Sequence, residues 1–409
     1  MQQKKITTAM LLVFTLALFT TSCKKNIAEK IVDKNNADAI QGNALARPLA
    51  TADFQKLADT LAFRLRGRVT GYTFIISYQG QYKTNRAGGQ CRKWPDVPAR
   101  AMTMYEKYSI ASVTKTITAA ALIKKMSEMP GGIANLDAVV WKYLPSHWVF
   151  SARFKTITFR QLLNHTSGIY YGMTGIGDGD DYQTLKKIAA SNGLSLYNPY
   201  VYNNRNYDLM RLLIPKIANY NIPQIIISNI PAYLIPGLEN AQASQYANAY
   251  KDYCRLVIFN KLGTTAAQTI DCVNTDAEPG LCYMIQSNLY SYFSGNDRTL
   301  VSGSQGWVLN TVQINDFFTK LQYTQTLLPY SLSNLMKNNK LGYDFAGNTT
   351  DGISCYWKNG IYDFVNTTPV GGYRSLIIGF GDDIQITMMA NSAINLENAA
   401  IAAHQDWHP

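Results

Sequence analysis

The chain has few charged residues, few histidines and few cysteines. Only 16% of its 409 residues are charged, and it contains 4 histidines and 6 cysteines. In contrast, 47% are hydrophobic, which excludes a disordered chain and is enough to form a large core. No C-x-x-C pair or Cys/His cluster is present, so the sequence predicts no zinc site and no other cofactor.

The net charge lacks the pattern of a nucleic-acid-binding protein. The formal charge is +11, but four of the lysines lie at the extreme N-terminus, and the other basic residues form no stripe (the four are Lys4, Lys5, Lys24 and Lys25). No recognition motif accompanies the charge. We therefore predict no nucleic-acid partner. A basic surface is also compatible with an acidic membrane or cell-wall polymer.

The N-terminal hydrophobic run, residues 9–19, is too short to span a bilayer. It follows two lysines and has the length of an export signal. The next residues, Thr20-Thr21-Ser22-Cys23, resemble a bacterial lipobox with Thr20 in place of the usual leucine. The alternative is a plain cleaved signal in which Cys23 has no role. The lipobox predicts an exported protein of the bacterial cell envelope, lipid-anchored at Cys23 and either periplasmic or associated with the outer membrane.

The remaining chain divides into a tether and one folded domain. Residues 24–50 are polar with no hydrophobic period, which predicts a flexible tether, and residues 51–409 form the predicted domain. Export permits disulfides. Five cysteines remain after Cys23, and their pairing stays open, although proximity favours Cys272 with Cys282 (the five are Cys91, Cys254, Cys272, Cys282 and Cys355).

Hydrophobic periodicity predicts an α+β fold. Period-two or continuous apolar runs predict a hairpin over 74–82, turning at Gln79-Gly80, and strands over 354–357, 373–380 and 384–390. Helical spacing predicts helices over 51–65, 112–126, 158–163, 207–217 and 394–403. We therefore expect an antiparallel sheet built from both chain ends and flanked by helices, with a mainly helical region from the middle. The 112–126 helix is apolar all round, which indicates a buried position.

Ser112-Val113-Thr114-Lys115 is an S-x-x-K element at the start of a predicted helix. Positions i and i+3 share one helical face, so the hydroxyl and the amine are expected to meet. A serine hydroxyl needs a base to take its proton, and a partly desolvated lysine with a lowered pKa can serve. Such an element also occurs by chance on solvated helix faces, so its context decides its meaning.

The context resembles a known family. The flanks Tyr108-Ser109-Ile110-Ala111 and Thr116-Ile117-Thr118-Ala119-Ala120 are similar to the segment around the nucleophile of class C β-lactamases and D-alanyl-D-alanine peptidases. Residues 157–169 (ITFRQLLNHTSGI) are similar to a longer signature of the same family. The resemblance covers residues 51–403. It implies a β-lactamase/transpeptidase-like fold with Ser112 as the acylated nucleophile and Lys115 as its base.

Tyr202-Asn203-Asn204 matches the Tyr-x-Asn triplet of that family. The resemblance implies that Tyr202 acts as a phenolate base or shares its proton with Lys115, while the Asn204 amide orients the lysine and the substrate carbonyl. Without that context, the triplet is an ordinary loop before a helix. His165 lies in a turn, where we expect it to fix the chain reversal by hydrogen bonding rather than to act in catalysis.

Lys358-Asn359-Gly360 stands where the family has Lys-Thr-Gly. The resemblance implies that Lys358 supplies positive charge for a substrate carboxylate and that Gly360 lets substrate approach the strand. It also implies an oxyanion hole formed by the backbone N–H groups of Ser112 and Ile361. Asn359 stands in this substrate-binding segment and is predicted to contact substrate, but it departs from the family pattern. Because an amide cannot relay a proton as a hydroxyl can, we expect slow lactam turnover.

Three other segments have simpler interpretations. Residues 175–181 (GIGDGDD) imitate a calcium or phosphate loop but lack the full ligand spacing, so no metal is predicted there. His404 and His408 have i, i+4 spacing, but a frayed terminal helix would leave them without a preformed site. Residues 215–243 look like an insertion that could border the substrate cleft and influence substrate choice.

Together these features predict a monomeric serine hydrolase that forms an acyl-enzyme. Its substrates would be D-amino-acid peptides, peptidoglycan among them, β-lactams or esters, with small esters and D-alanyl peptides reacting faster than cephalosporins. One alternative is a carboxylesterase of the same fold. The other is a noncatalytic wall-binding or sensor protein, which would not need the combination of Ser112, Lys115, Tyr202 and Lys358.

Overall fold

A computed structural model describes residues 50–407 except 177–178, 198, 227–229, 232–233, 264–269, 285–290, 294–296 and 364–370. The predicted signal peptide with Cys23, the tether up to residue 49, and His408 lie outside the described residues. The chain divides into a unit of residues 1–48 and a unit of residues 49–409, and the following description concerns the second. Within its described part, no helix is long and apolar enough to cross a membrane.

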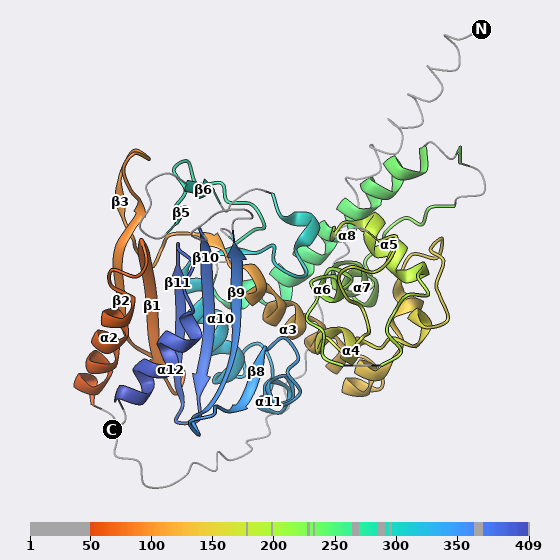
Figure 1. The fold of residues 1–409 in the computed structure, drawn as a ribbon. Coiled ribbons are helices and arrows are strands. Elements are labelled where there is room, and N and C mark those ends of the chain that lie inside the picture. Colours follow the sequence, from red (N-terminus) through yellow and green to blue (C-terminus); the bar gives the residue numbers. More distant parts are fainter. Residues whose placement is uncertain are drawn as a thin grey trace. The chain divides into compact units, whose positions relative to one another are not determined.

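The second unit combines a sheet with helices (Figure 1). The α-helices are α2 (Thr51–Leu65), α3 (Thr114–Ser127), α4 (Phe159–Leu163), α5 (Tyr182–Ala190), α6 (Arg205–Asp208), α7 (Met210–Ile217), α8 (Ile235–Val257), α10 (Thr311–Gln322), α11 (Tyr330–Asn338) and α12 (Leu396–Trp407). The strands are β1 (Gly71–Tyr78), β2 (Gln81–Arg92), β3 (Arg100–Ala101), β4 (Tyr108–Ser109), β5 (Leu281–Met284), β6 (Ser291–Phe293), β7 (Val308–Leu309), β8 (Phe345–Asn348), β9 (Ser354–Asp363), β10 (Gly371–Phe380) and β11 (Ile384–Ala390). The predicted α+β class is confirmed.

The main sheet is antiparallel and joins the two ends of the domain. Its order is β3-β2-β1-β11-β10-β5-β6, with β9 also pairing β10 and β8 pairing β9. Strand β1 lies against β11, with Tyr72 opposite Ala390. Gln79 and Gly80, which connect β1 to β2, have φ values of 49° and 72°, as a tight two-residue hairpin turn requires. The predicted sheet from both chain ends is therefore present.

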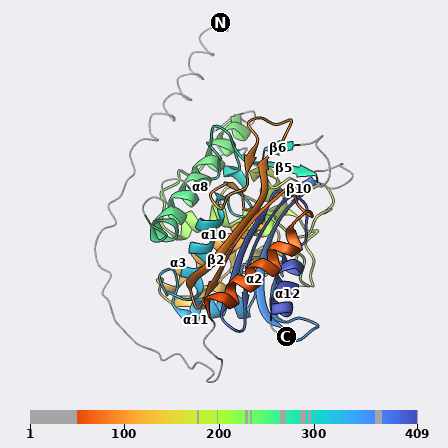
Figure 2. The same ribbon diagram turned by 90° about the vertical axis from the view of Figure 1, so that its left-hand side faces the viewer.

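Helices cover both faces of this sheet. In Figures 1 and 2, α2 and α12 lie together on one face, and α3 and α10 lie on the other. The first interface is apolar and includes Phe54, Leu61, Leu376 and Trp407. On the other face, every residue of α3 from Thr114 to Ile123 is buried. The prediction of a central, buried helix after Ser112 is therefore confirmed.

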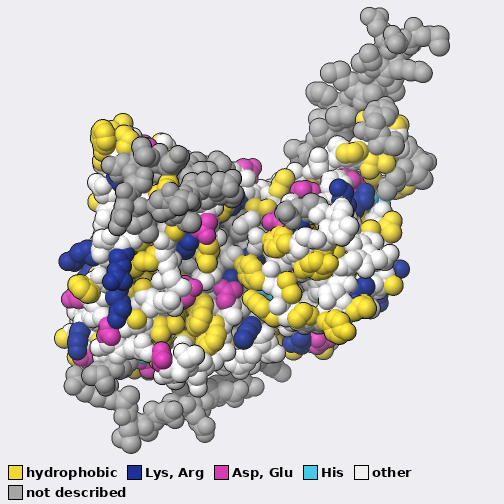
Figure 3. Space-filling model, viewed as in Figure 1, with side chains coloured by type: hydrophobic (Ala, Val, Ile, Leu, Met, Phe, Trp, Pro, Cys, Tyr) yellow, Lys and Arg dark blue, Asp and Glu magenta, His cyan; other side chains and the backbone are white. Residues whose placement is uncertain are grey.

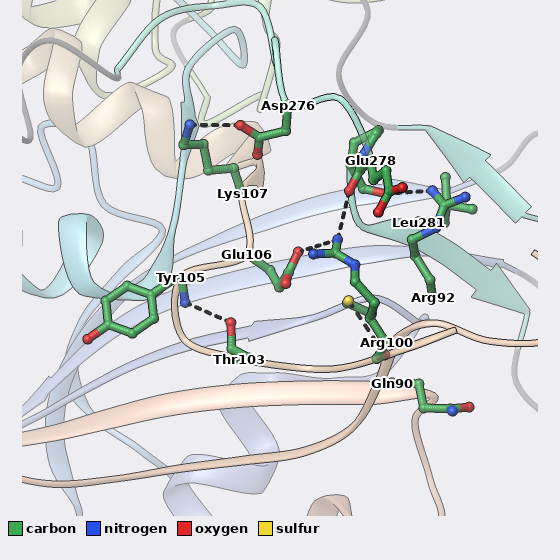
Figure 4. Close-up of polar contacts among 12 residues, drawn as sticks. Gln90, Arg92, Arg100, Thr103, Tyr105, Glu106, Lys107, Asp276, Glu278 and Leu281 are labelled. Carbon is green, nitrogen blue, oxygen red and sulfur yellow. Dashed lines mark hydrogen bonds and ion pairs between the residues drawn. The ribbon is translucent and has the colours of Figure 1, made fainter. Parts of the chain in front are cut away.

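A polar cluster anchors the segment that leads into the short strand β4 (Figure 4). Arg100 Nη2 donates to Glu106 Oε2 at 3.1 Å and to the Glu278 carbonyl at 2.7 Å. Lys107 Nζ lies 3.0 Å from Asp276 Oδ1. These contacts attach the chain before β4 to the segment before β5, so the residues that follow β4 start from a fixed position.

One sequence prediction about the later part of the chain needs correction. Cys272 is a buried free thiol, so it forms no disulfide with Cys282. The described part of residues 215–243 contacts α5 and an earlier turn: Tyr182 Oη donates to Gln242 Oε1 at 2.9 Å, and His147 Nε2 lies 3.0 Å from Glu239 Oε1. A role of this segment in substrate choice stays a prediction.

Candidate active site

Ser112 lies in a 3-10 turn, Ala111–Val113, directly before α3. Ala111 has a φ of 43°, in the left-handed region that costs a residue with a Cβ on the order of 1 kcal/mol. Ser375 Oγ on β10 donates to the Ile110 carbonyl at 2.7 Å, which ties this turn to the sheet. The strained turn thus places the Ser112 hydroxyl where the helical region meets the sheet.

Lys115 extends from the first turn of α3 to Ser112. Its Nζ donates to Ser112 Oγ at 3.0 Å, to Asn204 Oδ1 at 2.8 Å and to the Ser304 carbonyl at 2.9 Å. An ammonium group has three protons, so this fully buried lysine is completely hydrogen-bonded. The predicted contacts of Lys115 with Ser112 and Asn204 are present, whereas the contact with Ser304 was not predicted.

Tyr202 approaches the same hydroxyl from the loop before α6. Its Oη donates to Ser112 Oγ at 2.6 Å, and its ring centre lies 5.0 Å from Lys115 Nζ and 4.8 Å from Lys358 Nζ. Burial raises the pKa of Tyr202, but the charges of Lys115 and Lys358 outweigh burial and bring the pKa below its ordinary value. Burial also lowers the pKa of Lys115. Tyr202 and Lys115 therefore form a pair suited to accept a proton from Ser112.

His165 holds the Tyr202 loop in place. Its Nδ1 accepts hydrogen bonds from the Asn203 backbone at 3.3 Å and from the Asn206 amide at 3.1 Å. Its carbonyl accepts from Val201 N at 2.9 Å, and its ring centre is 4.5 Å from that of Tyr202. Burial brings the pKa of His165 well below its usual value, so the ring is neutral. His165 therefore has the predicted hydrogen-bonding role, and its partners belong to the Tyr202 loop and the start of α6.

Lys358 is buried on β9 and forms an ion pair that the sequence did not predict. Its Nζ lies 2.5 Å from Asp344 Oδ1, and Asp344 Oδ2 accepts from the Asn359 backbone N–H at 3.1 Å. Burial is the largest single influence on the pKa of Lys358 and lowers it, but Asp344, Tyr202 and Tyr200 together outweigh burial and raise the pKa, so the lysine stays charged. The role of Lys358 in binding a substrate carboxylate stays a prediction, and Asp344 is a partner inside the protein with which such a carboxylate would compete.

Asn359 faces away from this site. Its Nδ2 donates to Glu397 Oε1 on α12 at 3.0 Å. Because side chains alternate along a strand, Lys358 and Gly360 face the other side, where a Cβ added to Gly360 would meet the Ile110 carbonyl at 2.3 Å. Asn359 is therefore not in contact with Ser112, and the argument for slow lactam turnover from its amide loses its basis.

The predicted oxyanion hole depends on the direction of two backbone N–H groups. Asp344 N donates to the Trp357 carbonyl, and Asn359 N donates to the Asp344 side chain, so these peptide groups point away from β10. The alternation of a strand gives Ile361, two residues later, the same direction. Its N–H thus leaves the sheet at the open edge of β9, as an oxyanion hole shared with Ser112 requires.

Asp344 and the Ser304 carbonyl are two groups of the site that were not predicted from the sequence. Both are attached to α3: Thr116 Oγ1 donates to the Gly342 carbonyl at 2.7 Å, and Thr118 Oγ1 donates at 2.7 Å to the carbonyl of the residue before Ser304. The two threonines thus bring distant loops to the helix that carries Lys115. A backbone carbonyl is present in every residue, and a single acidic residue forms no motif with a defined spacing. Neither group could therefore be recognised from the sequence.

The described residues include no group of three or more His, Cys, Asp or Glu side chains that could hold a metal ion. Within the Gly/Asp-rich loop, residues 177–178 lie outside the described part. Asp181 caps α5, where its Oδ1 accepts from Thr184 N at 2.9 Å, and Asp180 lies 3.8 Å from Arg205. These aspartates have structural partners in the protein.

Comparison with known proteins agrees with this arrangement. The model of the Beta-lactamase family matches residues 50–408. Protein flp of Staphylococcus aureus (strain COL) is 31% identical over 181 residues, which are 41% of this chain and 34% of that protein. The chain thus spans about a third of the length of this relative.

Two solved structures share the fold. A β-lactamase/D-alanine carboxypeptidase from Yersinia pestis has a TM-score of 0.60 and 15% identity, covering 87% of this chain and 96% of that one. A D-amino acid amidase from Ochrobactrum anthropi SV3 has a TM-score of 0.58 and 16% identity, covering 88% and 100%. The sheet and helical region define a fold shared with hydrolases. This chain belongs to the Beta-lactamase family.

Proposed function

We propose that this protein is a serine hydrolase that forms an acyl-enzyme on Ser112 with esters, D-amino-acid peptides or amides, or β-lactams, and that it acts as a monomer. The observation that carries the proposal is the convergence on Ser112 Oγ of Tyr202 Oη at 2.6 Å and Lys115 Nζ at 3.0 Å. A nucleophile within hydrogen-bond reach of an activated base is the signature of covalent catalysis.

The proposed acylation begins when Ser112 Oγ attacks the substrate carbonyl carbon and its proton passes to the Tyr202–Lys115 pair. The N–H groups of Ser112 and Ile361 stabilise the resulting oxyanion. As the carbon–oxygen or carbon–nitrogen bond breaks, the leaving group takes the proton. Water then attacks the acyl carbon and loses a proton to the same pair. The bond between that carbon and Ser112 Oγ breaks, Ser112 Oγ takes the proton from the pair, and the acid leaves.

A carboxylesterase is the second candidate, and the Lys358–Asp344 ion pair favours it because an ester substrate needs no carboxylate anchor. The amidase and the carboxypeptidase among the solved structures support amides or peptides as the first candidate. A noncatalytic binding protein is less well supported. Binding alone gives no reason to bury a lysine beside a serine, since desolvating a charge costs free energy.

Acylation of Ser112 is expected to add one probe mass to the protein and to accelerate as the pH rises. The accepting base must be unprotonated, and the pKa values of Lys115 and Tyr202 are both lowered, so the rate should increase as the pH passes through the lowered values and level off above them. Intact-mass analysis after timed exposure to a fluorophosphonate, and in parallel to penicillin, measures this. No fluorophosphonate adduct, or a rate of its formation independent of pH between acid and neutral, would contradict the assignment.

We also propose that Cys23 anchors the protein to a membrane of the cell envelope through lipid. Cys23→Ser is expected to abolish fatty-acid incorporation and to move the protein from the membrane fraction to a soluble or uncleaved form. Metabolic labelling with a fatty-acid probe, followed by fractionation, measures both. The buried Cys272→Ser variant serves as the control and should be labelled normally. Failure of the probe to label the wild-type protein would refute the lipid anchor.

A further inference from the structure

The two lysines that face the Tyr202 ring are already engaged within the protein. Lys115 donates its three protons to Ser112, Asn204 and the Ser304 carbonyl. Lys358 lies against Asp344. A substrate carboxylate placed beside Tyr202 would therefore compete with Asn204 for Lys115 and with Asp344 for Lys358.

Asp344 is the member of the ion pair that a ligand would meet first. Its side chain is 20% exposed, against 2% for Lys358. It is also fixed, because its second oxygen accepts the Asn359 backbone N–H and the chain before it is attached to α3 through Gly342. The accessible charge at this end of the site is thus negative and held in place.

We infer that the Lys358–Asp344 pair excludes substrates with a carboxylate on the leaving group and that the site takes esters or amides whose acyl and leaving groups are uncharged. This inference rests on the proposed function, since it names the substrate class for the same acyl-enzyme chemistry. An anionic leaving group would lie near a fixed carboxylate in a partly buried site, where like charges repel more strongly than in water.

The surroundings of the site are apolar and suit uncharged groups. Tyr171, Tyr200 and Ile361 are large hydrophobic side chains that stay 43%, 51% and 47% exposed. Tyr171 Oη accepts from Asn204 N at 3.3 Å, and the Tyr200 ring is edge-on to His165 at 5.8 Å, so both belong to the Tyr202 region. Figure 3 shows hydrophobic side chains gathered over the helical region beside the hollow that separates it from the sheet. Aromatic and aliphatic surfaces of this kind bind apolar substituents.

Arg298 is a cation that would offer a carboxylate a different anchor. Its guanidinium lies 4.7 Å from the ring centre of Tyr362, which is the residue after Ile361 on β9, and Tyr362 stacks on Tyr373 at 5.1 Å. If this group bound a carboxylate, the enzyme would prefer anionic substrates in spite of Asp344. The test therefore includes an Arg298 variant.

The test compares two acetate esters, those of 4-hydroxybenzoate and of methyl 4-hydroxybenzoate. Both esters give the same acetyl-enzyme, so their kcat/KM values differ only through the acylation step. To remove the difference in intrinsic reactivity, the ratio of the two kcat/KM values is divided by the ratio of the two hydroxide-catalysed hydrolysis rates. The wild type is expected to prefer the uncharged ester roughly tenfold, and Asp344→Asn to remove most of that preference. Asp363→Asn is the matched control, because it removes a negative charge from β9, the strand that carries Lys358, but from a residue paired with Arg374. Its ratio should equal that of the wild type.

Two results would overturn the inference. One is a wild-type preference for the anionic ester, which Arg298→Gln abolishes where that guanidinium is the anchor, and the other is a ratio unchanged by Asp344→Asn in a folded variant. Competitive inhibition of the wild type by benzoate and by benzamide tests the inference without a variant. Tighter binding of benzoate than of benzamide would also contradict the inference. Failure of the proposed function itself would appear separately, as a wild-type protein that no fluorophosphonate labels.

Discussion

Replacement of Ser112 by alanine is expected to lower kcat by about 10⁴–10⁶-fold and to prevent labelling by a fluorophosphonate. The substitution deletes the atom on which Tyr202 and Lys115 converge. It should leave the fold intact, since alanine suits the start of a helix and the lysine keeps its bonds to Asn204 and Ser304. Steady-state ester hydrolysis, intact mass and circular dichroism measure the three effects.

The matched control is Ser127→Ala at the other end of α3. Ser127 Oγ donates only to the Lys124 carbonyl of its own helix, so removing this hydroxyl should change kcat less than about twofold and shift the free energy of unfolding by about 0.5 kcal/mol at most. Hydrolysis retained in folded Ser112→Ala protein would mean that another residue is the nucleophile, and the proposed function would then be wrong.

Tyr202→Phe is expected to slow acylation by about 10²–10⁴-fold, the usual contribution of a general base. The change removes the hydroxyl that lies 2.6 Å from Ser112 Oγ but keeps the ring that contacts His165 and the two lysines. The slope of rate against pH should decrease as well, because one member of the proton-accepting pair is lost. Pre-steady-state acylation by an activated ester over a pH series measures both effects.

Tyr200→Phe is the control for this variant. Tyr200 belongs to the same loop and its ring lies edge-on to His165, but it makes no contact with Ser112 comparable to that of Tyr202. Its acylation rate and pH profile should stay close to those of the wild type. If Tyr202→Phe kept its rate and profile, Lys115 alone would be the base. Equal losses in the two variants would indicate a structural effect on the loop.

The amino-acid sequence by itself determined the local features of this protein. The S-x-x-K spacing predicts that Ser112 and Lys115 meet, and they lie 3.0 Å apart, because residues three apart share a helical face whatever surrounds them. The turn at Gln79-Gly80 is also a local feature, because the glycine and the strand pattern that follows it are sufficient to predict a hairpin turn. The resemblance also located Tyr202 and Asn204, which the fold brings to Lys115 from 87 and 89 positions away along the chain.

Only the tertiary structure decided the charge of the site and the direction of individual strand residues. Asp344 precedes Lys358 by 14 residues, and the pair forms because Gly342 is attached to α3 and β8 returns beside β9. Asn359 seemed to be a substrate-binding residue, yet it contacts Glu397 on α12, since neighbouring strand residues face opposite sides and the covering helices determine which side is the site. Contacts within one helical turn follow from covalent geometry, whereas contacts between distant segments depend on how all the layers pack together.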